Sequence, residues 1–122
     1  MGVYIYTDGD FDFDKPISAE KVAEINKYLE AEHREEGAIS PWCDYRIADD
    51  GTGIEVHDEE GYNNSLNAEW LKEIIKRLPE GVVVKGEIYF NDSCGEYWTY
   101  KIVDNIIYEC TGYIAYEEPK EV

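Results

Sequence analysis

Apolar and polar residues alternate along the first stretch of the chain. One parity carries the apolar residues Val3, Ile5, Phe11 and Phe13, and the other carries Tyr4, Tyr6, Asp8, Asp10, Asp12 and Asp14. Alternation with a period of two is typical of a β-strand with one buried face. The pattern therefore predicts a strand over residues 3–13, with a bulge or bend at Gly9 and an end before Pro16.

Two later stretches have the spacing of amphipathic helices. After a Ser18 N-cap, Val22, Ile25 and Leu29 recur at helical intervals, which predicts a helix over residues 18–36 with Gly37 just beyond its end. A second helix is predicted over residues 65–78, from an apolar stripe that Pro79-Glu80-Gly81 stops: Leu66, Trp70, Leu71, Ile74, Ile75 and Leu78.

The remaining segments have the composition of strands and turns. Residues 42–48 and 52–58 are expected to pair across an Asp49-Asp50-Gly51 turn, residues 59–64 to form a loop, and residues 82–91 to form a strong strand. Residues 97–103 and 106–116 are expected to form a hairpin across Asp104-Asn105, with aromatic side chains such as Trp98 and Tyr100 used for packing.

The predicted order is β-α-β-β-α-β followed by a C-terminal β-hairpin. This order favours an α+β, ferredoxin-like fold in which two helices cover one face of an antiparallel sheet. The length of 122 residues suits a single domain, with a frayed tail over residues 117–122.

The charge of the chain changes the functional picture. Its formal net charge is −17, which exceeds the magnitude of about 2–8 that solubility requires in a small domain. Such a charge opposes binding to nucleic acid or to an anionic membrane and favours basic protein partners. Simple solvation, or a salt-adapted source, would also account for it. Residues 8–60 hold 17 acidic against five basic side chains, so most of the negative charge lies in the first half.

The four aspartates of the first strand are the sharpest local feature. On a strand, alternate residues share one face at about 6.6 Å intervals, so Asp8, Asp10, Asp12 and Asp14 would present a row of carboxylates to a partner. A solvated edge strand is the alternative interpretation. A calcium site is another, although Phe13 and Ala19 stand where an EF-hand loop needs Gly and Glu.

Other acidic segments would extend this surface. Glu30 and Glu32 lie near the end of the first predicted helix, where negative charge does not stabilise it. The remaining candidate residues for partner binding come from that region, a hairpin turn and a loop: Glu35, Glu36, Asp49, Asp50, Asp58, Glu59, Glu60 and Tyr62.

No motif for catalysis, a cofactor or a metal stands out. Cys43, Cys94 and Cys110 include no Cys-x-x-Cys pair, which favours thiols in a reducing cytoplasm. His33 and His57 are isolated, and a Cys43–His57 pair has no orienting motif. Neither a signal peptide nor a membrane-spanning run is expected. The sequence thus predicts a cytoplasmic, non-enzymatic protein without a cofactor.

Short motifs at both ends of the chain resemble a family of small bacterial and phage proteins. The resemblance is carried by four segments: residues 2–6 with Gly9-Asp10, residues 78–81 (LPEG), residues 86–88 (GEI) and residues 95–98 (GEYW). It implies no known activity, and the aspartate row departs from the family pattern. In size and acidity alone, the chain is also similar to phage-encoded DNA-mimic proteins, including anti-CRISPR inhibitors.

These observations lead to one main functional hypothesis. The acidic surface of residues 8–14, with nearby loops, would occupy the nucleic-acid groove of a basic partner such as a phage-defence nuclease. A small Ca²⁺-binding module and a small enzyme or ligand-binding domain of unrecognised type are the alternatives. The sequence does not specify the partner or the oligomeric state.

Overall fold

The computed structural model describes residues 3–57, 60–61, 65–92, 95–111 and 120–122. The elements follow the chain in the order β1 (Val3–Phe13), α1 (Ala19–Glu30), β2 (Tyr45–Ile47), β3 (Gly53–Val56), β4 (Glu60–Gly61), α2 (Ala68–Arg77), β5 (Val84–Asp92), β6 (Tyr97–Val103), β7 (Ile106–Thr111) and β8 (Lys120–Glu121). The prediction of an α+β fold is confirmed.

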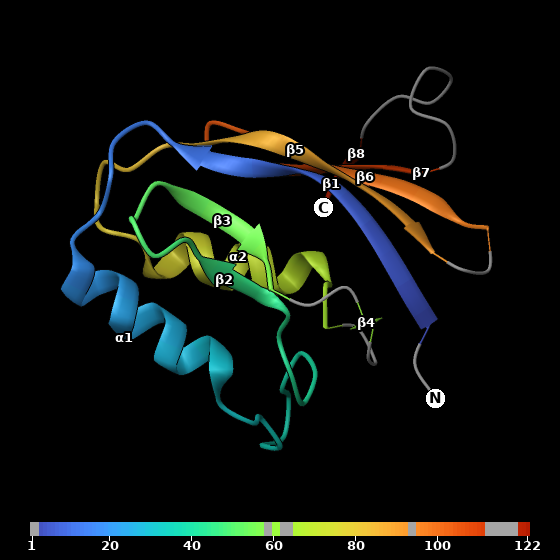
Figure 1. The fold of residues 1–122 in the computed structure, drawn as a ribbon, viewed down its shortest axis with the longest axis horizontal. Coiled ribbons are helices and arrows are strands. Elements are labelled where there is room, and N and C mark those ends of the chain that lie inside the picture. The colour runs from blue at the N-terminus through green and yellow to red at the C-terminus, as the bar shows by residue number, and fades with distance from the viewer. Residues whose placement is uncertain (1–2, 58–59, 62–64, 93–94, 112–119) are drawn as a thin grey trace.

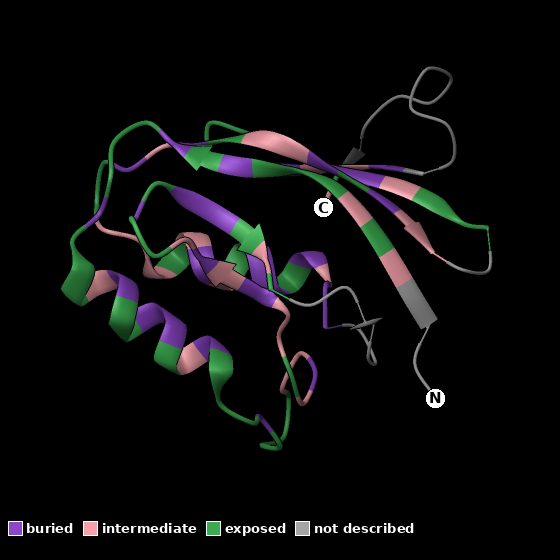
Figure 2. Ribbon diagram, viewed as in Figure 1, coloured by how far each residue is buried: buried purple, intermediate pink, exposed green. Residues whose placement is uncertain are grey.

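The main strands form one antiparallel sheet in the order β2-β3-β1-β5-β6-β7, and the two-residue strands β4 and β8 pair with β1 and β7. Both helices lie on the same side of this sheet (Figure 1). We call the side that faces the helices the inner face and the opposite side the outer face. Buried positions are concentrated where the sheet faces the helices (Figure 2).

Strand β1 lies in the centre of the sheet and follows the predicted alternation. Phe11 and Phe13 are buried at 0% and 8% exposure on the inner face. The β1–β5 ladder runs without a bulge from the Ile5–Asp92 pair to the Phe13–Val84 pair. Gly9 and Gly86 instead supply a bend, with φ of +105° and +132°.

The two backbones approach closely at this bend. A Cβ atom on Gly9 would lie 2.3 Å from the Glu87 carbonyl oxygen, and one on Gly86 would lie 2.5 Å from that of Asp10. Only glycine fits such positions without moving the neighbouring strand.

Helix α1 begins as predicted but ends earlier. Ser18 accepts a hydrogen bond from the Lys21 amide at 3.2 Å, as an N-cap does. The helix ends at Glu30 rather than near residue 36, because the chain turns back and buries His33. The His33 ring places Nε2 2.8 Å from the Tyr28 carbonyl, which also accepts a hydrogen bond from the Ala31 amide at 3.4 Å at the helix end.

Helix α2 is also shorter than predicted. It begins at Ala68 rather than at residue 65, with Asn67 as its N-cap, and the Asn67 side chain accepts a hydrogen bond from the Glu69 amide at 2.8 Å. Trp70, Leu71 and Ile74 are buried as the apolar stripe predicts.

A side chain of α1 completes the edge of the sheet at β2. Asn26 is buried, donates from Nδ2 to the Ile47 carbonyl at 3.0 Å and accepts from the Ile47 amide at 2.8 Å. The Asn26 amide therefore acts as a short substitute for a neighbouring strand. β2 and β3 are shorter than the predicted 42–48 and 52–58, and β4 lies in a segment predicted as loop.

The β6–β7 hairpin has the predicted two-residue turn, with Asp104 and Asn105 at positive φ (49° and 67°). On the inner face, Phe90 stacks on Trp98 at 5.2 Å between ring centroids and meets Tyr100 edge-on at 5.3 Å. The sequence did not predict β8, which pairs with β7. Just beyond β8, the Val122 amide donates a hydrogen bond to the Ile107 carbonyl.

Candidate functional site

Three aspartates of β1 form an exposed row on the outer face of the sheet. Asp8, Asp10 and Asp12 alternate with the inward-facing residues and are all exposed. Among the residues that the structure describes, no Lys, Arg or His nitrogen lies within 4.0 Å of these carboxylates. Their charge is therefore available to solvent or to a partner. We refer to these three residues as the acidic row.

The neighbouring strand adds both signs of charge to this face. Asp10 lies opposite Glu87, whereas Asp12 lies opposite Lys85. Lys101 of β6 lies opposite Glu87 on its other side. The negative charge is thus densest around Asp10 and declines toward the β6–β7 side of the sheet.

Asp14, the fourth predicted member of the row, has a structural role. Its Oδ1 accepts a hydrogen bond from the Val83 amide at 2.8 Å, and its own amide donates to the Val83 carbonyl at 2.9 Å. These two bonds fasten the end of β1 to the start of β5. Asp14 is exposed, but its carboxylate is already engaged by the fold.

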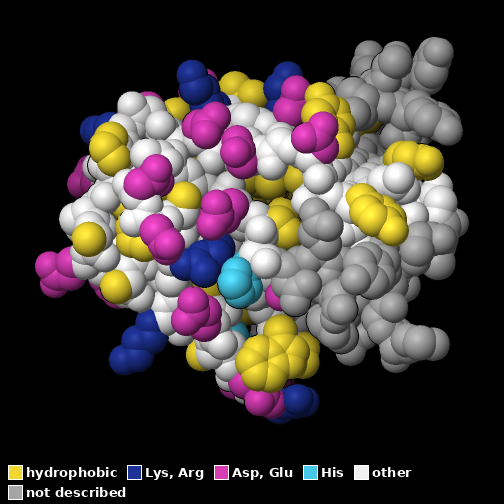
Figure 3. Space-filling model, viewed as in Figure 1, with side chains coloured by type: hydrophobic (Ala, Val, Ile, Leu, Met, Phe, Trp, Pro, Cys, Tyr) yellow, Lys and Arg dark blue, Asp and Glu magenta, His cyan; other side chains and the backbone are white. Residues whose placement is uncertain are grey.

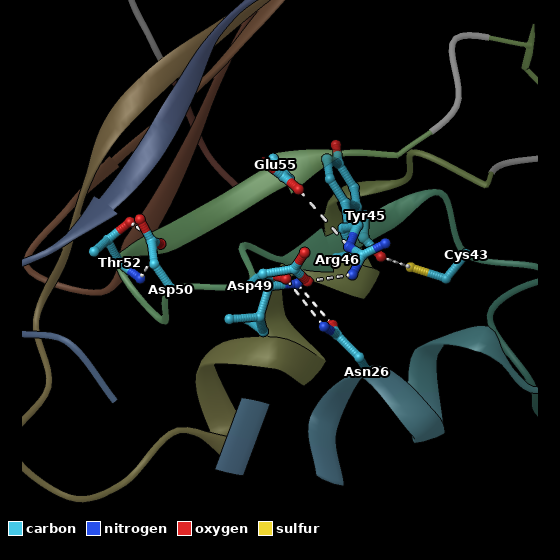
Figure 4. Close-up of polar contacts among 9 residues, drawn as sticks. Asn26, Cys43, Tyr45, Arg46, Asp49, Asp50, Thr52 and Glu55 are labelled. Atoms are coloured by element: carbon cyan, nitrogen blue, oxygen red, sulfur yellow. Dashed lines mark hydrogen bonds and ion pairs between the residues drawn. The ribbon is translucent and has the colours of Figure 1, made fainter. Parts of the chain in front are cut away.

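The turn between β2 and β3 lies beside the end of β1, because the Phe13 amide donates to the Thr52 carbonyl at 2.8 Å. Asp50 accepts hydrogen bonds from the Thr52 hydroxyl at 2.6 Å and amide at 3.1 Å, which lower the pKa of the Asp50 carboxyl (Figure 4). Oδ1 of Asp49 accepts a hydrogen bond from Nη2 of Arg46 at 2.8 Å. This turn extends the acidic region, although Arg46 neutralises part of it.

Arg46 itself lies between two carboxylates. Besides its bond to Asp49, its Nε lies 3.7 Å from Oε1 of Glu55, its partner across the β2–β3 ladder. Figure 4 shows the guanidinium between these two side chains. Ion pairs at the rim of the sheet, where the Arg46 side chain is 23% exposed, contribute little to stability but lower the net negative charge beside the row.

Glu35 and Glu36 lie apart from the acidic row. They belong to the loop that follows α1, on the helix side of the molecule rather than on the outer face of the sheet (Figure 1). Glu35 lies 3.3 Å from Nδ1 of His33. Backbone hydrogen bonding at Glu35, with a smaller contribution from His33, lowers the pKa of the Glu35 carboxyl. The structure thus does not bring this predicted segment into the row.

The remaining candidate residues are only partly covered by the structure. Asp58, Glu59 and Tyr62 lie outside the described residues. Glu60 is described as part of β4, where its backbone pairs with Tyr4 at the start of β1. The row and the β2–β3 turn are therefore the acidic segments that can be shown to lie together.

Acidic side chains are not confined to this region. Figure 3 shows Asp and Glu side chains across the described part of the side in view, with Lys, Arg and His among them. The negative field is consequently broad, and the acidic row is distinguished within it by its regular spacing and by having no ion pair with another described residue.

Sequence reasoning missed three tyrosines that lie on the same face as the acidic row. Tyr6, Tyr89 and Tyr97 are 55%, 37% and 40% exposed. Tyr6 shares the parity of the aspartates, so the sequence carried a signal for it, but the positions of Tyr89 and Tyr97 follow only from the pairing register. Hydrogen bonding to Glu87, followed by desolvation and the charges of Glu87 and Asp8, raises the pKa of Tyr89.

The structure shows no arrangement for nucleophilic or metal chemistry in the described part of the chain. Burial raises the pKa of the Cys43 thiol to about 12, the reverse of what an attacking thiolate requires. Within the described ranges, no group of three or more His, Cys, Asp or Glu side chains is placed to hold a metal ion. Likewise, no described helix is long and apolar enough to span a membrane.

Comparison with known proteins provides no relative for this chain: no family model, no curated protein and no solved structure matches it.

Proposed function

We propose that this chain is a non-enzymatic, cytoplasmic interaction protein that occupies a basic, nucleic-acid-binding surface of a partner protein. The observation that carries the proposal is the acidic row: three exposed carboxylates at regular intervals on an outward sheet face, without an ion pair among the described residues. A nuclease of a phage-defence system, such as a CRISPR nuclease, is a concrete example of such a partner.

The spacing of the row supports this choice of partner. Carboxylates on alternate residues of a strand stand about 6.6 Å apart, which is of the same order as the separation of phosphates along a nucleic-acid strand. A groove that binds a phosphate backbone presents Lys and Arg at matching intervals. A rigid strand can therefore satisfy several of these cations at once.

The overall charge supports the same proposal. A net charge of −17 attracts a basic surface over long range and accelerates the encounter at low ionic strength. The same charge repels nucleic acid and anionic lipid, so the protein would bind the partner rather than the nucleic acid.

The experiment is a competition between this protein and nucleic acid for a panel of purified nucleases. Asp8→Asn/Asp10→Asn removes two charges from the row, and Glu30→Gln/Glu36→Gln removes two exposed charges from the end of α1 and the loop after it. We expect the row variant to weaken inhibition by about tenfold or more at about 0.1 M salt, and the control variant to retain it. Equal losses of inhibition in both variants would show that net charge, rather than the acidic row, causes the inhibition. If the wild-type protein inhibits none of the nucleases, the proposal is rejected.

We also propose that the first part of the fold is ferredoxin-like. In support, β3 lies between β1 and β2, which are joined through α1, and β5 lies on the other side of β1. This is the arrangement of a split βαβ unit, to which β6 and β7 add the C-terminal hairpin.

A further inference from the structure

The outer face of the sheet gathers most of the exposed apolar side chains. Five of the six large hydrophobic residues that are exposed among the described residues lie there, and the sixth, Trp42, lies in the loop before β2. The five come from β1, β5, β6 and β7: Tyr6, Tyr89, Tyr97, Val103 and Ile106. Neither described helix covers this face (Figure 1). Apolar side chains that are exposed together on one face mark an interaction surface.

The tyrosines of this face stand beside the acidic row. Tyr89 is the cross-strand partner of Asp8. Asn91 of β5 is the cross-strand partner of Tyr6 on β1 and of Tyr97 on β6, so the two tyrosines lie on either side of it. Neighbouring strands are about 4.8 Å apart, so the three rings and the carboxylates of the row form one continuous patch, which we call the tyrosine–aspartate patch.

Arginine is the side chain whose chemistry fits this patch. A guanidinium group is planar, stacks on an aromatic ring and donates paired hydrogen bonds to a carboxylate. A lysine ammonium is a compact, strongly hydrated charge that gains less from stacking. Carboxylates attract both cations, and exposed tyrosines beside the carboxylates add a preference for arginine through stacking.

A buried hydroxyl on the same face is consistent with a hydrogen-bond donor as ligand. Thr99 lies opposite Tyr89 in the β5–β6 ladder and is 3% exposed. Its Oγ1 has no hydrogen-bond partner in the described structure. Buried polar atoms are normally satisfied, and a guanidinium N–H that enters beside Tyr89 is a suitable donor.

Charge excludes a second copy of this chain as the occupant of this patch. Two copies that met through it would oppose like rows of carboxylates, each on a chain with a net charge of −17. An arginine-rich protein segment is complementary both to the charge and to the rings.

We infer that the tyrosine–aspartate patch binds arginine side chains of the partner. Tyr6, Tyr89 and Tyr97 stack on the guanidinium groups, and the carboxylates of the acidic row form ion pairs with the same groups. The inference deepens the proposed function and rests on it. A single nucleic-acid strand also presents flat rings beside regularly spaced anions, and grooves that bind such strands combine cations with stacking side chains. The partner class is thus a protein that binds single-stranded nucleic acid through arginines.

The test uses fluorescent peptides of nine arginines and nine lysines as probes, with binding to the full chain followed by anisotropy. We expect the wild-type protein to bind the arginine peptide at least about fivefold more tightly than the lysine peptide. Tyr6→Leu/Tyr89→Leu/Tyr97→Leu should reduce this preference to below about twofold. Asp8→Asn/Asp10→Asn should weaken both peptides and reduce their salt dependence, but keep the preference for arginine.

Trp42→Leu is the matched control, because Trp42 is 45% exposed but does not belong to the sheet. It should leave the preference unchanged. Ring chemical shifts of ¹³C-labelled tyrosine in the wild-type protein give a second measurement that needs no variant to fold, and Tyr89 should shift with the arginine peptide. Equal affinity for the two peptides, unshifted rings, or the same loss in Trp42→Leu would overturn the inference. If the protein inhibits a nuclease but binds the two peptides equally, only this inference is overturned. If the protein inhibits none of the nucleases in the competition experiment, the proposed function is overturned.

Discussion

Neutralising Asp10 should stabilise this protein, because Asp10 is the most crowded carboxylate of the acidic row. It has Asp8 and Asp12 two residues away on β1 and Glu87 directly across on β5. Neighbours along the strand lie about 6.6 Å away, and a cross-strand neighbour lies about 5 Å away. In water, unit charges at these separations repel by about 0.6 and 0.8 kcal/mol.

The size of the gain depends on salt. The three repulsions sum to about 2 kcal/mol without screening, and a Debye length of about 8 Å at physiological ionic strength reduces the sum to about 1 kcal/mol. At about 1 M salt, the remainder is about 0.3 kcal/mol. Asp10→Asn should therefore raise the free energy of unfolding by about 1–2 kcal/mol at low salt, and the gain should decline steadily as salt is added.

The assay is urea unfolding of the wild-type protein and Asp10→Asn at about 20 mM, 0.15 M and 1 M sodium chloride. Glu24→Gln is the matched control, because Glu24 lies 3.5 Å from the Lys21 ammonium and its removal should be neutral or slightly destabilising. A loss of stability in Asp10→Asn, or a gain that does not change with salt, would show that the row does not repel itself as the geometry requires.

Three further predictions concern the scaffold that presents the row. Gly86→Ala should lower the free energy of unfolding by about 3 kcal/mol or prevent folding, because its Cβ would lie 2.5 Å from the Asp10 carbonyl oxygen; Gly37→Ala, at φ of +85° with nothing within 4 Å, should cost only about 1 kcal/mol in the same urea titration. Asn26→Ala leaves the buried Ile47 amide and carbonyl without their side-chain partner and should cost about 2–4 kcal/mol by thermal unfolding, and a mild effect would show that Asn26 does not complete the sheet edge. Burial raises the pKa of Cys43 from 9.0 to about 12, so the contribution of this thiol to the free energy of unfolding is fully present below about pH 9 and is lost as the pH rises toward 12, because the unfolded thiol ionises first. Cys43→Ala should remove about 3 kcal/mol of the decline between pH 8 and 11, and an unaltered alkaline decline would contradict this assignment.

The sequence predicts the fold class because the long elements carry strong periodicity. The alternation of β1, the Ser18 cap and the apolar stripe of α2 are all local signals. The end of α1 is not local, since His33 returns to the Tyr28 carbonyl and takes the place of a glycine cap. Strands of two residues, such as β4 and β8, are too short to show a period.

The candidate site was predictable to a similar extent. Parity alone places Asp8, Asp10 and Asp12 on one face, and the structure leaves them exposed there. Parity cannot show that the Asp14 carboxylate binds the Val83 amide, since this contact joins residues 69 positions apart. Nor can it place Tyr89 beside Asp8, because this neighbour depends on the register between β1 and β5.

The central position of β1 has a consequence for the rate of folding and for aggregation of the unfolded chain. During synthesis, β1 finds its main partner only when β5 has been made, because Phe13 pairs with Val84 and Ile5 with Asp92. Contacts of such long sequence separation slow folding. During this delay, a strand that carries Phe11 and Phe13 is exposed to other chains, and the aspartates that alternate with these rings act as gatekeepers against aggregation.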